Sequence, residues 1–382
     1  MATPEVDVDK PRPRTSTRDP EDLRARLERW MTARLSPGAR PEVSALAAPE
    51  GNGMSSETLL FEAAWYEEGT RRTESLVARV APDVTAMPVF PVYDLDLQFR
   101  VIKLVGELSS VPVPTVRWSE PDPDALGAPF FVMDRVEGRV PPDLMPYNFG
   151  SWLSEASPAD QATLQTSSVA ALAGLHGIRE AEDRFSFLAS PRAERSALGR
   201  HVGELRAYCD WVAGGGPRSP LLERCFNWLG EHWPEDEGPT VLLWGDSRIG
   251  NVLYRGFEPA AVLDWEMAAL GPAEIDLGWF IFLHRFFEDL AAGAGLPGMP
   301  DFLRRDDVAG TYESLSGHAP RDLDFYTLYA ALRHGAVMSR VQRRAIYFGE
   351  ATMPDDVDDL ILHRSTIEAM LAGTYWSELS GR

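Results

Sequence analysis

The amino-acid sequence predicts an α+β fold, with a sheet in the N-terminal part of the chain and mostly helices in the remainder. Short apolar runs of strand length recur between residues 59 and 134, whereas apolar residues at helical spacing dominate from Gly150 onward. Two further strand-length runs, at residues 241–243 and 260–263, each end close to an acidic residue. This pattern favours two lobes, a smaller one built on strands and a larger one built on helices.

The composition is that of a soluble globular protein and argues against several classes of partner. Of 382 residues, 44% are apolar and 25% are charged. No run of about eighteen apolar residues exists, so we expect no membrane span. The net charge of −21 repels nucleic acid and anionic membranes, so neither is an expected partner. The acidic balance either favours solubility alone or also attracts a cationic substrate.

Cysteine usage and the N-terminal segment both indicate a cytoplasmic location. Cys209 and Cys225 lack metal-ligand spacing and predict free thiols in a reducing compartment. Residues 1–19 are rich in proline and charge and lack the apolar segment of a secretory signal, so we expect a flexible leader there. The strand-based lobe is then predicted over residues 20–138 and the helical lobe over residues 139–382, with the boundary at a turn-rich stretch.

The elements can be assigned in order. A first helix begins at Asp19, an N-cap acid followed by Pro20, and ends before Pro37. Further along we predict strands at residues 59–65 and 75–80, a strand and hinge within residues 129–138, and helices at residues 93–108, 159–177, 196–213 and 219–233. The chain from Phe280 to Leu379 is expected to be helical.

A turn rich in glycine and serine precedes the strand at residues 59–65. The turn contains Gly51, Gly53, Ser55 and Ser56, which have small side chains or none. Their backbone N–H groups could bind the phosphates of a nucleotide. The turn matches neither Gly-x-x-x-x-Gly-Lys nor Gly-x-Gly-x-x-Gly, so by itself it favours an ordinary hairpin loop. Arg79, in the strand at residues 75–80, could bind phosphate or could lie at a strand edge in solvent.

The most informative stretch spans residues 241–279. Asp246 is followed five residues later by Asn251, and Asp264 ends a second apolar run. One carboxylate can orient a hydroxyl group and accept its proton, while an amide oxygen and a second carboxylate are hard ligands suited to Mg²⁺ on a nucleotide phosphate. The alternative is structural: Asp246 and Asn251 would cap a turn, and Asp264 would cap a helix.

The sequence around these residues favours the first alternative. Trp-Gly-Asp-Ser-Arg-Ile-Gly-Asn-Val-Leu, followed by Val-Leu-Asp-Trp-Glu, resembles the aminoglycoside phosphotransferase-like family of small-molecule kinases, within the protein-kinase-like superfamily. The resemblance implies a bilobal protein-kinase-like fold. Two departures stand out, because that family usually has His where this chain has Trp244, and Glu where it has Gln98.

The resemblance implies a role for each residue of the site. Asp246 would be the catalytic base, and Asn251 and Asp264 would hold Mg²⁺ between the phosphates of ATP. Arg248 would contact the γ-phosphate or the substrate, or would serve packing. Arg79 and the loop at residues 51–56 would hold the triphosphate, which assigns nucleotide binding to the smaller lobe and catalysis to the larger one.

The resemblance also implies a position for the adenine ring and a structural acid. Adenine would lie beside Met133, with the backbone C=O of Asp134 and the N–H of Val136 at its edge. Asp276, in Gly-Pro-Ala-Glu-Ile-Asp-Leu-Gly-Trp, would shape the catalytic loop.

The predicted function is ATP- and Mg²⁺-dependent transfer of the γ-phosphate to a hydroxyl group of a small molecule. Aminoglycosides, which would link the protein to antibiotic resistance, and hydroxyacyl compounds are both open as acceptors. Two other classes also stay open: a nucleotide-binding pseudokinase with a regulatory role, motivated by Gln98 and Trp244, and an acyl-coenzyme-binding protein without transfer. Arg340, Arg343 and Arg344 could bind an anionic substrate tail such as a coenzyme, or could form a solvated helix face.

Overall fold

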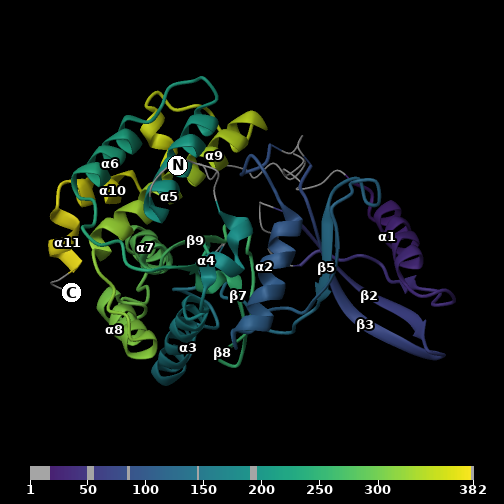
Figure 1. Ribbon diagram of the computed structural model, residues 1–382. Coiled ribbons are helices and arrows are strands. Elements are labelled where there is room, and N and C mark those ends of the chain that lie inside the picture. The colour runs from purple at the N-terminus through teal and green to yellow at the C-terminus, as the bar shows by residue number, and fades with distance from the viewer. Residues whose placement is uncertain (1–17, 50–55, 84–86, 144–145, 190–195, 380–382) are drawn as a thin grey trace. The chain divides into compact units, whose positions relative to one another are not determined.

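The computed structural model describes residues 18–49, 56–83, 87–143, 146–189 and 196–379 (Figure 1). The predicted leader therefore lies almost wholly outside the described residues, as do Gly51, Gly53 and Ser55. The chain forms two compact units, each described by itself below. The first comprises residues 1–96, 118–133 and 344–351, and the second comprises residues 97–117, 134–343 and 352–382.

A five-stranded sheet forms the N-terminal part of the fold, with the order β1-β2-β3-β5-β4. Its strands are β1 (Glu42–Val43), β2 (Glu57–Glu67), β3 (Thr70–Val80), β4 (Val116–Glu120) and β5 (Phe130–Asp134). β2 and β3 form a long antiparallel hairpin whose turn residues, Glu68 and Gly69, both have positive φ (Figure 1). That conformation matches the right-handed twist of the two strands.

The first unit has its own core, which packs one helix against this sheet. Helix α1 (Pro20–Arg34) is capped by the Asp19 side chain and buries Leu27 and Trp30. The Trp30 ring meets the rings of Trp118 and Phe130 edge-on, with centroids 6.0 and 4.8 Å away. The predicted helix start at Asp19 and the predicted strands of this region are confirmed.

The second unit is mostly helical. Its longer helices are α2 (Leu95–Leu108, whose first two residues belong to the first unit), α3 (Pro158–His176), α5 (Ala197–Ala213), α6 (Pro220–Glu231), α7 (Glu274–Gly293), α8 (Arg305–Ser316), α9 (Leu323–Tyr347) and α10 (Arg364–Leu371). Short helical segments are α4 (Ala181–Arg184), α11 (Thr374–Leu379) and the 3₁₀ turns Ser186–Leu188, Ile249–Asn251 and Val357–Leu360. The predicted α+β class is confirmed.

Helix α7 is the centre of this unit. It is apolar around most of its circumference, and every residue from Glu274 to His284 is buried. A helix that is apolar on all sides is expected in the middle of a core. α7 shares this core with α5, α6, α9 and α10, through residues such as Leu205, Leu229, Phe282 and Leu328. None of the described helices is long and apolar enough to cross a membrane.

Two small antiparallel ribbons carry the predicted site residues. β6 (Thr240–Leu243) pairs with β9 (Ala269–Pro272), and β7 (Val252–Arg255) pairs with β8 (Glu258–Val262). The loop with Asp246 joins β6 to β7, and Asp264 lies between β8 and β9. The ribbons therefore present both acids from loops fixed at each end.

Candidate active site

The loop between β6 and β7 can adopt its path because of one glycine. Gly245 has φ +91°, and a Cβ atom there would collide with the backbone carbonyl of Met267. Only glycine tolerates both this conformation and this close approach. The loop that carries Asp246 is therefore packed directly against the segment that follows Asp264.

Asp246 has its two carboxylate oxygens engaged by different donors. Oδ1 accepts a hydrogen bond from Trp279 Nε1 at 2.8 Å, and Oδ2 accepts one from Asn251 Nδ2 at 2.7 Å. Arg248 Nε also donates to Oδ2, at 3.2 Å. Burial raises the pKa of Asp246, but the Arg248 charge and these hydrogen bonds lower it by more, so the net shift is downward. The carboxylate is thus ionised at neutral pH.

Asn251 and Asp264 are tied together through the backbone. Leu263 N donates to Asn251 O at 2.9 Å, and the Trp244 indole donates to Leu263 O at 2.7 Å. Asp264 has a φ of +56°, a conformation that Asp adopts more readily than most residues. Trp244, which stands where the resembled family has His, therefore braces the segment that ends in Asp264.

The donor set fits a hard divalent cation. Asn251 is 4% exposed, and its Nδ2 donates to both the backbone and the side chain of Asp246. Its Oδ1 accepts no hydrogen bond within the described part of the chain and remains free for a ligand. Together with the Asp264 carboxylate it provides the hard oxygen ligands that Mg²⁺ prefers.

Arg248 bridges two acids across the loop. Its guanidinium forms ion pairs with Asp246 and with Asp143, a residue that precedes helix α3. Burial lowers the pKa of Arg248, but the surrounding carboxylates, which include Asp264, raise it by more. A Cβ atom on Gly250 would press on both Asp143 and Arg248, so glycine at this position leaves room for the pair.

Asp276, at the start of α7, binds the backbone of the loop that carries Asp246. Its Oδ2 accepts a hydrogen bond from Trp244 N at 2.7 Å and its Oδ1 accepts one from Gly245 N at 2.9 Å. His176 Nε2 lies 3.1 Å from Oδ2, and its Nδ1 lies 2.9 Å from the Tyr312 hydroxyl. The fully buried carboxylate therefore connects the loop to α3 and α8.

The remaining predicted residues lie on the sheet and just after it. Ser56 is buried, and its hydroxyl has no hydrogen-bond partner among the described residues. Arg79, in β3, donates to the Thr58 hydroxyl at 2.9 Å, and Met133 is buried in β5. These three belong to the first unit, and their placement around a nucleotide with Asp246 stays a prediction.

Asp134 and Val136, the two residues predicted at the edge of the adenine ring, belong to the second unit. Asp134 pairs with Arg117 through both carboxylate oxygens, at 2.5 and 3.0 Å. Val136 is partly exposed. Gln98, in α2, is 3% exposed, so it is a core residue and not one on the helix surface.

Three contacts of the loop were not predicted from the sequence. Trp279 donates to Asp246, Asp143 pairs with Arg248, and Arg333 Nη1 donates to Gly245 O at 3.1 Å. The Arg333 guanidinium also lies 4.9 Å from the Trp279 ring centroid. The motif around Asp276 includes Trp279 and could have indicated it, whereas no local signal marks Asp143 or Arg333.

Comparison with known proteins decides the family. Residues 61–305 match the sequence model of the phosphotransferase enzyme family, more than half of the chain. The chain belongs to the phosphotransferase enzyme family. A putative aminoglycoside phosphotransferase from Ralstonia eutropha has a similar structure, with a TM-score of 0.63 and 20% identity over 92% of this chain and 98% of that one.

Two further structures have the same fold. An ethanolamine kinase from Plasmodium vivax aligns with a TM-score of 0.58 and 10% identity, over 90% of this phosphotransferase and 87% of that chain. An ADP-bound aminoglycoside phosphotransferase aligns with a TM-score of 0.54 and 13% identity, over 92% and 99%. The predicted protein-kinase-like fold is confirmed.

The curated relatives are named as acyl-CoA dehydrogenases and not as phosphotransferases. Human acyl-CoA dehydrogenase family member 11 is 26% identical over 262 residues, which are 66% of this phosphotransferase and 30% of that protein. The probable acyl-CoA dehydrogenase IBR3 of Arabidopsis thaliana is 24% identical over 327 residues, 77% and 36% of the two chains. The chain thus spans about a third of the length of the curated relatives it matches.

Proposed function

We propose that this phosphotransferase transfers the γ-phosphate of ATP to a hydroxyl group of a small molecule. The observation that carries the proposal is the geometry of Asp246, an ionised carboxylate fixed through both oxygens by Trp279 and Asn251. A base on a loop with this support can accept a proton without rearranging. Family membership supports the reaction class, and the fit of the site supports an active enzyme.

In the proposed reaction Asp246 orients the acceptor hydroxyl and takes its proton late. The acceptor oxygen forms a bond to the γ-phosphorus as the bond from that phosphorus to the bridging oxygen breaks, and ADP leaves. Such transfer passes through a loose transition state and depends mostly on positioning and charge neutralisation. The donors from Trp279 and Asn251 supply the positioning by fixing the carboxylate.

Each predicted nucleotide residue would contact a different part of ATP. Asn251 and Asp264 would hold Mg²⁺, which neutralises negative charge on the phosphates when it is bound. Arg79 and the loop at residues 51–56 would hold the triphosphate, and the backbone around Met133 would contact adenine. Nearby carboxylates raise the pKa of Arg248, so its guanidinium stays charged. It would bind the γ-phosphate if the phosphate replaced one of these carboxylates as its partner.

The acceptor is the open part of the proposal. A hydroxyacyl thioester is one candidate, because the curated relatives are named as acyl-CoA dehydrogenases. Arg343 Nε is buried with no hydrogen-bond partner among the described residues, and the Arg340 guanidinium lies 4.3 Å from the Trp211 ring. Arginines of this kind suit the phosphate groups of a coenzyme. An aminoglycoside is the second candidate and would match the acidic composition.

The test is a screen for transfer with a matched variant. The purified chain is incubated with ATP, Mg²⁺ and a panel that includes aminoglycosides and hydroxyacyl thioesters, and ADP release and phosphorylated product are measured. We expect at least one acceptor to stimulate ADP release, and Asp246→Asn to reduce kcat by roughly 10²- to 10⁴-fold. Asp301→Asn, at an exposed residue, should leave it unchanged. Equal transfer by the Asp246→Asn variant would refute the enzyme mechanism.

The two alternatives give different results in the same preparation. A pseudokinase would bind ATP in calorimetry but release no ADP with any member of the panel. An acyl-coenzyme-binding protein would bind the thioester with the same affinity in the presence and absence of nucleotide, and would not phosphorylate it.

A further inference from the structure

A cavity lies within the second unit, apart from the loop with Asp246. It has a volume of about 670 Å³ and is formed where the C-terminal end of α6 meets the N-terminal ends of α8 and α9. Sites for small organic molecules typically occupy about 300–1,000 Å³. None of the residues that line it belongs to the loop between β6 and β7.

One side of the cavity is aromatic. Phe325 is buried, and its ring contacts those of Trp228 and Trp233 at centroid distances of 6.5 and 5.7 Å. The Trp228 ring stacks on His232 at 3.9 Å and 9°, and His232 Nδ1 donates to Trp228 O, which fixes the pair. Trp233 Nε1 donates to Glu237 at 2.9 Å, outside the cavity lining. The partly exposed rings therefore present aromatic surface to a ligand.

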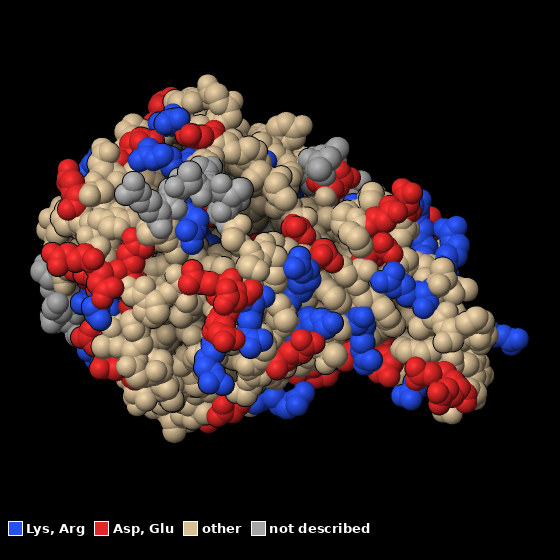
Figure 2. Space-filling model, viewed as in Figure 1, with Lys and Arg blue, Asp and Glu red and all other residues tan. Residues whose placement is uncertain are grey.

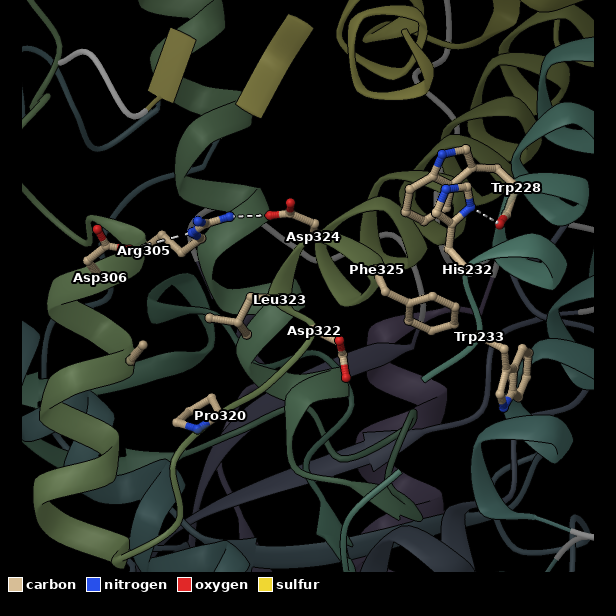
Figure 3. A pocket seen from close by; sticks show the side chains of 11 residues that line it. Trp228, His232, Trp233, Arg305, Asp306, Pro320, Asp322, Leu323, Asp324 and Phe325 are labelled. Atoms are coloured by element: carbon tan, nitrogen blue, oxygen red, sulfur yellow. Dashed lines mark hydrogen bonds and ion pairs between the residues drawn. The ribbon is translucent and has the colours of Figure 1, made fainter. Parts of the chain in front are cut away.

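The other side is charged, with an excess of carboxylates. Arg305 forms ion pairs with Asp306 and Asp324 and is the cation among the lining residues. Figure 3 shows this trio on one side, the aromatic rings on the other, and Asp322 between them. The Asp322 carboxylate has no hydrogen bond or ion pair within the described ranges. Three carboxylates thus face one guanidinium that is already paired.

Helix α9 separates this cavity from the catalytic loop. Leu323, which lines the cavity, begins the helix, and Arg333, which donates to Gly245 O, lies ten residues later. Ten helical residues span about 15 Å. A ligand in the cavity would therefore lie beyond reach of the carboxylate of Asp246.

We propose that this cavity binds an organic cation, an ammonium or quaternary ammonium group that carries an apolar body. Aromatic faces attract such cations, and the Asp322 carboxylate supplies the charge. An anion would meet the excess of carboxylates, because Arg305 is already bound to two of them. A neutral apolar ligand would leave Asp322 without a counter-charge.

Calorimetry of the full chain tests the proposal. The probe is benzyltrimethylammonium, which has no hydroxyl group to accept phosphate, and the comparison is 3-phenylpropionate, an anion of similar size. We expect saturable binding of the cation and no measurable binding of the anion. Trp233→Ala should weaken binding about tenfold, Trp233→Phe should retain most of it, and Asp322→Asn should weaken it about threefold.

One conservative test variant and two control variants make the result decisive. Asp322→Asn keeps the shape of a residue with φ +50°, which asparagine also tolerates, so it should fold even if Trp233→Ala does not. Asp301→Asn removes a neighbouring exposed charge outside the lining and should change nothing. Asp246→Asn should also bind the cation normally. The proposal would be overturned if the cation did not bind, or if both probes bound equally. It would also be overturned if Asp246→Asn lost cation binding while Asp322→Asn retained it.

Discussion

Each oxygen of Asp246 has its own donor, so the carboxylate cannot rotate freely. Trp279 holds Oδ1, while Asn251 and Arg248 hold Oδ2. Asn251 fixes this carboxylate through its NH₂ group, while its side-chain oxygen accepts no hydrogen bond among the described residues. In the proposed reaction, a side chain fixed in this way would need little reorganisation when the acceptor hydroxyl binds.

Trp279 is therefore a positioning residue for Asp246, the proposed base. Trp279→Phe keeps the ring but removes the donor to Oδ1, and we expect kcat to fall about tenfold, the cost of one hydrogen bond to a charged group. Since that bond lowers the pKa of Asp246, its loss should raise the pKa. Because the pKa of Asp246 lies below the ordinary 3.8, the acidic limb of the kcat–pH profile should then move upward from below that pH, which steady-state assays extended down to about pH 3 would detect.

A matched tryptophan controls for a general packing effect. Trp152 Nε1 donates to Val140 O, and the side chain touches no residue of the loop with Asp246 in the contacts described. Trp152→Phe should leave the pH profile in place. If Trp279→Phe reduced kcat without moving the acidic limb, its role would be packing alone.

At the scale of elements, Asp276 connects α7 to the catalytic loop and to α3. It accepts two backbone N–H groups and lies in contact with His176 in a site with no exposed surface. Each of these donors would lose its partner if the carboxylate were removed, and unsatisfied buried donors are costly. The loop geometry therefore depends on the first turn of a helix thirty residues further along the chain.

Asp276→Asn should accordingly destabilise the protein. An amide has one acceptor oxygen in place of two, and its NH₂ group would face a backbone N–H, so we expect a loss of about 3 kcal/mol in the free energy of unfolding. Urea denaturation followed by tryptophan fluorescence would measure it. The exposed variant Asp301→Asn should lose less than about 0.5 kcal/mol, and an equal loss in both would contradict this role for Asp276.

Local elements could be predicted from the sequence, whereas their long-range contacts could not. The strands around Asp246 and Asp264 follow from short apolar runs bounded by turn residues, and the cap at Asp19 follows from one residue and its neighbours. The pairing of Arg248 with Asp143 joins residues 105 positions apart. No periodicity or spacing encodes such a contact, which exists only after the helices have packed.

At the scale of the whole molecule, several histidines are buried in the core of the second unit. His363 Nε2 donates to Ala331 O at 2.9 Å, and its Nδ1 lies 3.4 Å from Nδ1 of His334 among the rings of Phe282 and Phe286. The sequence predicted helices here but gave no sign of the histidine pair. Burial lowers the pKa of His363 to about 4 and that of His284 to about 3.

These shifts predict an acid-sensitive fold. An unfolded histidine titrates near pH 6.5, so between that pH and about 4 the unfolded chain binds a proton that the folded His363 does not. The free energy of unfolding must therefore fall as the pH falls below 6.5, by about 2 kcal/mol per buried histidine between pH 7 and pH 5. Urea denaturation at the two pH values would measure the difference.

Replacing one histidine should remove its share of this dependence. His363→Asn is expected to lower stability at pH 7, since it loses packing, but to reduce the fall between pH 7 and pH 5 by about 2 kcal/mol. Leu360→Ala, at a buried residue that carries no proton, should destabilise the protein equally at both pH values and leave the fall intact. If both variants kept the full pH dependence, the proton uptake that drives acid unfolding would have to arise from residues other than His363.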